Sequence, residues 1–116
     1  MVNEEINKIE VLNKLKELKE LSNGLSNSLE KHGILITDIN KERLFESNIK
    51  STITAIEGLL RNEPSEKHTL RLQKEIPDSY KNISEVKKTN AGKLNSIALD
   101  KLKSLMSYFE QIYERI

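Results

Sequence analysis

The two histidines are the residues of this chain best suited to metal binding or acid-base chemistry, because the sequence has no cysteine. A di-metal site in a helical bundle uses glutamates and Glu-x-x-His pairs, since residues three apart share one helix face. Here Glu66 and His68 are two residues apart, and so are Glu30 and His32. Each pair therefore points to different faces, and the sequence predicts neither a metal site nor a cofactor.

His68 is also the one candidate for phosphoryl transfer. The stretch His68-Thr69-Leu70-Arg71-Leu72 resembles in part the motif of histidine phosphotransfer domains, in which a lysine follows the histidine by three residues and a glycine comes next. Arg71 can replace that lysine, but Leu72 stands at the glycine position and belongs to an apolar stripe. The resemblance implies a phosphotransfer function, whereas the simpler interpretation of His68 is a solvated surface histidine.

Other catalytic motifs are missing from the sequence. The chain has four glycines in 116 residues, and it contains no glycine-rich phosphate loop, nucleophile elbow or clustered acid pair. We therefore expect a protein that is not an enzyme.

Lysines dominate the segment 81–103, which carries a local net charge of +4 although the whole chain has +1. A nucleic-acid surface usually combines arginines with aromatic platforms, and this segment has no arginine and no aromatic side chain apart from Tyr80 at its edge. The pattern favours a solvated helix face over an acidic protein partner, and both over nucleic acid.

The elements that must position these residues are amphipathic helices. The clearest stripe runs through 6–29, where apolar residues recur at helical spacing. Its members are Val11, Leu15, Leu18, Leu25 and Leu29, with Leu21 at the edge. The second stripe comprises Phe45, Ile49, Ile53, Ile56 and Leu60, flanked by Thr52 and Leu59. The third comprises Leu72, Ile76, Tyr80 and Ile83, and the last Ala98, Leu102, Leu105, Met106, Phe109, Ile112, Tyr113 and Ile116.

These stripes predict an all-α protein, a single domain over residues 1–116 with helices at about 4–32, 38–62, 65–90 and 93–115. Four helices of similar length with short connections most simply form an antiparallel, up-down-up-down four-helix bundle. The third helix is kinked or broken at Pro77, and the preserved stripe favours a kink. Asn90-Ala91-Gly92 predicts a turn, the alternative being a helix that continues through it.

Residues that stop and start helices set the expected boundaries. Asn3 is a plausible first N-cap, and Gly33 can close the first helix. Residues 34–36 would form a buried apolar turn, after which Thr37 or Asp38 caps the second helix. Pro64 disfavours helix at the residue before it, so the second helix is expected to end there.

Composition leaves a narrow set of protein classes. Hydrophobic residues are 36% and charged residues 32% of the chain, as is usual for amphipathic helices that each bury one stripe. No segment approaches the length of apolar residues that a membrane span requires, and the first residues have neither a basic start nor an apolar run. We expect a cytoplasmic protein without membrane insertion.

Some apolar residues lie off the core stripes. Ile6, Ile9 and Leu12 turn away from the main stripe of the first helix, and Ile97 and Tyr108 lie outside that of the last. Helix ends in a small bundle can bury more than one side, which is the simpler interpretation. The alternative is a second apolar surface for a partner or for self-association, since exposed apolar patches mark interfaces.

We therefore expect a non-enzymatic bundle that acts by binding another protein, as an adaptor, secretion chaperone, immunity protein or inhibitor does. The expected partner-binding residues are Ile6, Ile9, Leu12, Ile97 and Tyr108, with rim charges from Lys87, Lys88 and Lys93. The alternatives are a self-associating coiled-coil protein, for instance a homodimer, and a phosphotransfer domain that uses His68.

Overall fold

The computed structural model describes residues 8–31, 36–61 and 65–112. Within these ranges it describes the side chains of residues 8–28, 46–61 and 66–112. These residues form helices α1 (Lys8–Lys31), α2 (Ile36–Leu60), α3 (Ser65–Lys87), α4 (Asn90–Leu94) and α5 (Ser96–Ile112). The described part of the chain contains no strand. The prediction of an all-α protein is confirmed.

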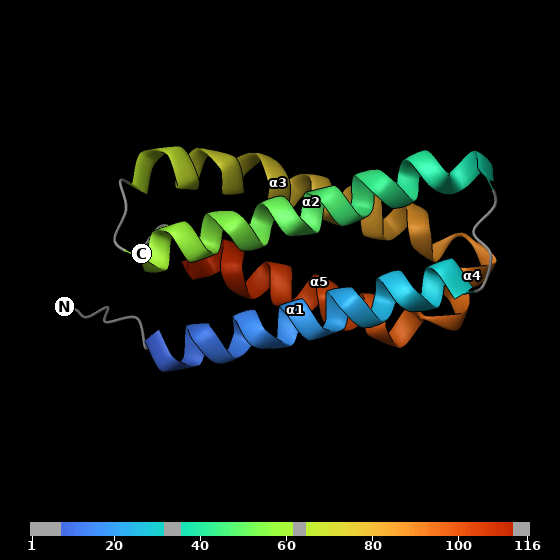
Figure 1. Ribbon diagram of the computed structural model, residues 1–116, viewed down its shortest axis with the longest axis horizontal. Coiled ribbons are helices and arrows are strands. Elements are labelled where there is room, and N and C mark those ends of the chain that lie inside the picture. Colours follow the sequence, from blue (N-terminus) through green and yellow to red (C-terminus); the bar gives the residue numbers. More distant parts are fainter. Residues whose placement is uncertain (1–7, 32–35, 62–64, 113–116) are drawn as a thin grey trace.

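The four long helices lie along the long axis of an elongated molecule that measures 48 × 24 × 18 Å (Figure 1). Helix α2 packs most extensively on α3, and α3 also packs on α5. Helix α1 contacts both α2 and α5, whereas the described residues of α1 do not reach α3 and those of α2 do not reach α5. Each long helix therefore has two long neighbours, and all four face one shared interior.

Apolar stripes from all four long helices fill that interior. The most deeply buried side chains are Leu18, Leu25, Ile49, Ile56, Leu72, Ile76, Ile83, Leu99, Leu102, Met106 and Phe109. Full burial of one such side chain stabilises a fold by about 1.5–3 kcal/mol relative to exposure, so this core is the main source of stability. The predicted stripes of α1, α3 and α5 supply most of these residues.

The stripe of α2 is shifted from its predicted position. Thr52 and Leu59, which the sequence placed at its flanks, are buried, whereas Ile53 and Leu60 at its predicted centre are only partly buried. Thr52 is tolerated in the core because its hydroxyl donates to the Asn48 carbonyl one turn earlier, at 2.9 Å. Phe45, Leu29, Tyr113 and Ile116 have side chains that lie outside the described residues.

Helix boundaries differ from the predicted ones at the start of α2. This helix begins at Ile36, so Thr37 and Asp38 lie inside it and neither is its N-cap. Ile36 is likewise helical and not part of a turn. The predicted roles of Asn3, Gly33 and Pro64 fall outside the described residues.

Helix α3 continues through Pro77. The alternative in which a helix ends near Glu75 and another begins at Pro77 is therefore wrong, while the kink stays a prediction. Polar groups cluster beside this position: Asn48 on α2 is buried, and its Nδ2 donates to the Glu75 carbonyl and to Glu75 Oε1, both at 2.8 Å. A proline removes one backbone donor from a helix, and these side-chain bonds tie the affected turn to α2.

The turn after α3 lies earlier than predicted. Lys88 and Thr89 form it, and Asn90, Ala91 and Gly92 belong to α4, so neither the predicted turn nor the continuous helix is correct. The cause is Thr89, whose Oγ1 accepts a hydrogen bond from Gly92 N at 2.9 Å as an N-cap. The same hydroxyl donates to the Val86 carbonyl at 2.7 Å and so closes α3 as it opens α4.

Gly92 allows α4 to sit against the end of α3. A Cβ atom at this position would overlap the carbonyl group of Val86, which is backbone and cannot rotate away. At Gly24, in the middle of α1, a Cβ atom would meet no atom within 4 Å. The two glycines therefore differ sharply in what an added methyl group would do.

We predict that Gly92→Ala lowers the free energy of unfolding by about 1–3 kcal/mol, because α4 must move away from α3 to relieve the overlap. Gly24→Ala is the matched control and should raise the free energy of unfolding by about 0.5–1 kcal/mol, since alanine favours a helix interior. Urea denaturation followed by circular dichroism measures both changes. Equal effects of the two substitutions would contradict the close approach at Gly92.

Candidate protein-binding surface

The predicted partner-binding residues of α1 are exposed. Ile9 has 71% and Leu12 53% of its surface accessible to solvent. Both lie in the first two turns of α1, and neither belongs to the core, so the interpretation that they bury a second side of the helix is wrong for these two. Ile6 lies outside the described residues.

Ile97 is even more exposed, at 86%, near the start of α5. Leu94, the last residue of α4, is 70% exposed, and the sequence reasoning did not single it out. Leu94 stands three residues before Ile97, so the two would share one face of the predicted helix at 93–115, and this spacing could have identified Leu94 from the sequence. In Figure 1 the start of α5 lies beside α4, at the opposite end of the molecule from the start of α1. The predicted residues therefore form two separate regions.

Tyr108 belongs to the contact between α5 and α1. Its ring packs edge-to-face on Phe109, with a centroid distance of 5.2 Å and an interplanar angle of 80°. Lys14 on α1 places its Nζ 5.7 Å from the Tyr108 ring centroid, within the range of a cation–π contact. Burial, and next the charge and hydrogen bond of the Glu10 carboxylate, raise the pKa of the Tyr108 phenol. Tyr108 is thus partly buried at the contact between α5 and α1, and its role in binding a partner stays a prediction.

The predicted rim lysines have different surroundings. Lys87 forms an ion pair with Asp100 of α5, which fixes the end of α3 to the last helix. Lys88, in the turn between α3 and α4, and Lys93, in α4, are both exposed. They lie near Leu94 along the chain, so the lysines belong to the region around α4 and not to the start of α1.

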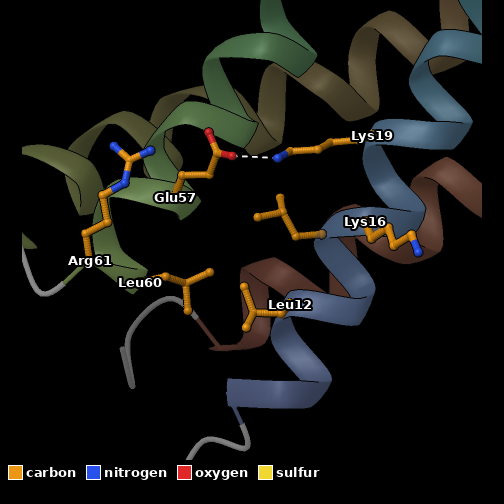
Figure 2. Close-up of a pocket in the computed structure, with 7 residues that line it drawn as sticks. Leu12, Lys16, Lys19, Glu57, Leu60 and Arg61 are labelled. Atoms are coloured by element: carbon orange, nitrogen blue, oxygen red, sulfur yellow. Dashed lines mark hydrogen bonds and ion pairs between the residues drawn. The ribbon is translucent and has the colours of Figure 1, made fainter.

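Leu12 lines a groove of about 390 Å³ between α1 and α2, shown in Figure 2. Leu12, Leu15 and Leu60 supply its apolar surface. Leu15 is buried and forms part of the core, whereas Leu12 and the half-buried Leu60 remain accessible. This arrangement is an apolar floor open to solvent, as in grooves that receive an apolar side chain of a partner.

Charged side chains surround this apolar floor. Lys16 and Lys19 come from α1, and Glu57 and Arg61 come from α2. Lys19 Nζ lies 2.6 Å from Glu57 Oε2 and so bridges the two helices across the groove (Figure 2). Among the residues that the structure describes, the lining has three cationic side chains and one carboxylate, Glu57, which is paired with Lys19.

A second groove, of about 400 Å³, lies between α2 and α3 beside Pro77 and is polar. Its lining residues are Ser47, Asn48, Lys74, Glu75, Asp78, Lys81, Asn82 and Glu85. Asn48 is occupied by its hydrogen bonds to Glu75, and Asn82 lies 3.5 Å from the Asn48 side-chain oxygen. Positive and negative charges alternate here without forming a recognisable catalytic arrangement.

His68 lies against α2 and is half-buried. A Cβ atom at Gly58 would overlap the Cε1 and Nε2 atoms of the His68 ring. A phosphodonor would therefore have to reach an imidazole whose Nε2 edge rests on the neighbouring helix, which is a poor geometry for in-line phosphoryl transfer. The phosphotransfer hypothesis gains no support from this placement.

Among the residues that the structure describes, no three acidic or histidine side chains gather as a metal site would require. Within the same part of the chain, no helix is long and apolar enough to cross a membrane.

We predict that Glu10→Gln lowers the pKa of Tyr108 only part of the way to the ordinary phenol value, because burial, the larger cause of its rise, remains. An NMR titration that follows the ring Cζ carbon of each tyrosine measures this change. The pKa of Tyr80, which is raised by burial and by Glu110, should not respond and serves as the internal control. A Tyr108 midpoint that does not move would contradict the proposed contact with Glu10.

Comparisons of the chain with protein-family models, with curated proteins and with solved structures found no match. No relative therefore assigns a ligand or an activity to any of these residues. The features that bear on function are therefore the exposure, shape and charge of the groove between α1 and α2.

Proposed function

We propose that this protein is a non-enzymatic helical bundle that acts by binding another protein in the groove between α1 and α2. The observation that carries the proposal is Leu12, a large apolar side chain that is 53% exposed at the mouth of a concave apolar site. Exposed apolar surface costs solubility, and it is typical of protein interaction sites when it is concave and has a charged rim.

We also propose that the four long helices form an antiparallel, up-down-up-down bundle. Support comes from the circular order of their contacts, in which α1 meets α2 and α5 and α3 meets α2 and α5. The short gaps between successive helices add to this, since a short connection favours antiparallel neighbours. In such a bundle the groove lies near the start of α1 and the end of α2.

We predict that Leu12→Glu abolishes capture of the natural protein partner from an extract of the native host, as read by mass spectrometry of the captured proteins. The introduced carboxylate would lie over the apolar floor, where a buried and unpaired charge opposes binding. The fold should survive, because Leu12 is outside the core and Lys8 and Lys16 lie one turn away on either side.

Leu70→Glu is the matched control for this experiment. Leu70 has nearly the same exposure, 58%, but lies on α3 outside the groove. It should capture the same partner as the wild type, and circular dichroism with urea denaturation should show both variants folded. If Leu12→Glu is folded and retains the partner, or if Leu70→Glu loses it, the groove is not the binding site.

A further inference from the structure

We infer that two copies of this chain form a dimer by exchanging α4 and α5, and that Leu94 and Ile97 lie at the new contact between the copies in this exchanged dimer. The inference concerns the end of the molecule that carries α4 and is independent of the groove between α1 and α2 (Figure 1). The evidence is a two-residue turn between helices, together with two exposed apolar side chains that continue the stripe of α3.

The turn that separates α3 from α4 consists of Lys88 and Thr89 alone. Helix α3 ends at Lys87 and α4 begins at Asn90, so the residues on both sides are already helical. Thr89 has φ −81° and ψ 162°, whereas a helical residue has about −63° and about −42°. Because its φ is close to the helical value, Thr89 differs from a helical residue mainly in one backbone angle, ψ.

One hydroxyl group holds this turn. Thr89 Oγ1 donates to the Val86 carbonyl at 2.7 Å and accepts from Gly92 N at 2.9 Å. In a continuous helix the Val86 carbonyl would instead accept from the amide of Asn90, four residues later. Opening the turn therefore exchanges the hydrogen bonds of the cap for those of a helix.

The two exposed apolar side chains indicate how the opened chain packs. Leu94 is 70% and Ile97 86% exposed. They follow Ile83 by 11 and 14 residues, which is about three and about four turns of a continuous helix. Ile83 belongs to the buried stripe of α3, together with Leu72 and Ile76. If α3 ran straight into α4 and α5, both exposed side chains would therefore extend the buried stripe of α3.

A second copy of this chain is the partner that fits the opened form. Once the turn is open, α5 no longer packs on its own α1 and α3, and its apolar stripe needs an equivalent surface. The α1 and α3 helices of another copy carry that same surface, so the exchanged dimer rebuilds the core contacts of the monomer. The two long helices would pass each other at the opened turns, where their extended stripes meet and cover Leu94 and Ile97. Another protein would have to imitate this surface, whereas a second copy already has it.

The native pair of Lys101 and Glu17 can report the exchange without any substitution. Lys101 Nζ on α5 lies 3.9 Å from Glu17 Oε1 on α1, so a carbodiimide can join the two side chains. Isotope-labelled and unlabelled full-length chains are mixed in urea, refolded at millimolar concentration, separated by size and cross-linked. In the dimer fraction, mass spectrometry should find linked peptides that pair a labelled with an unlabelled chain. Dimers whose linked peptides are all unmixed would overturn the inference.

Substitutions in the turn should change the amount of dimer in opposite directions. Thr89→Ala removes the cap in both copies and should raise the association constant about tenfold or more, as measured by sedimentation after refolding. Asn90→Pro should give a folded monomer and no dimer, because proline suits the first residue of α4 but breaks a continuous helix. The matched control is Thr54→Ala, which removes a hydroxyl that bonds within α2 and should leave the association constant unchanged.

The exposed pair is tested separately. Leu94→Glu combined with Ile97→Glu should fold as a monomer, because both side chains are exposed there, and should lose the dimer, in which the carboxylates would be covered. Leu70→Glu adds a charge at an exposed leucine of α3 and should retain the dimer. Circular dichroism checks that every variant is folded.

Two results with folded variants would overturn the inference. The first is a wild type and a Thr89→Ala variant that both stay monomeric after refolding at millimolar concentration. The second is a dimer that Asn90→Pro retains. If the double glutamate variant dissociates that dimer, the exposed pair associates without exchange of α5.

Discussion

The structure depends on one constraint: each long helix has a single apolar stripe, and no stripe can be buried without the other helices. Leu18, Ile56, Ile76 and Phe109 come from four different helices and are all essentially inaccessible to solvent. A helix of this composition is marginal alone, because most helical stability in proteins comes from packing of an amphipathic face. The core therefore fixes which face of each helix remains for binding, and on α1 that face includes Ile9 and Leu12.

Helical spacing in the sequence predicted the all-α fold and most of the core, because spacing is a local property that survives folding. Helical spacing did not predict the helix boundary that a side-chain hydroxyl sets. Asn90-Ala91-Gly92 has turn-forming composition, yet the Thr89 hydroxyl caps a short helix there. The surroundings of Tyr108 could not be predicted from spacing for a related reason: whether a flanking residue is covered depends on the neighbouring helix, here through Lys14 and Glu10 of α1.

The candidate site was predictable only in part. The exposure of Leu12 could be predicted, because Leu12 lies off the apolar stripe of its own helix. The groove also needs Glu57, Leu60 and Arg61, which come from α2 about 40 residues later and meet α1 only in the folded protein. The pairing of Lys19 with Glu57 could not be inferred from one sequence, because many lysines and glutamates satisfy the same helical spacing.

The order of the helix contacts has a consequence for how the chain folds. The contacts between α2 and α3 and between α3 and α5 join helices that are close along the sequence, whereas α1 meets α5 only after the chain has closed a long loop. Loop closure costs entropy before distant contacts repay it, so the contact between α1 and α5 is expected to form last, whereas α1 and α2 are neighbours along the chain and can pair earlier. A molecule bound between α1 and α2 would stabilise the folded state, because it binds only a chain in which these two helices are packed against each other.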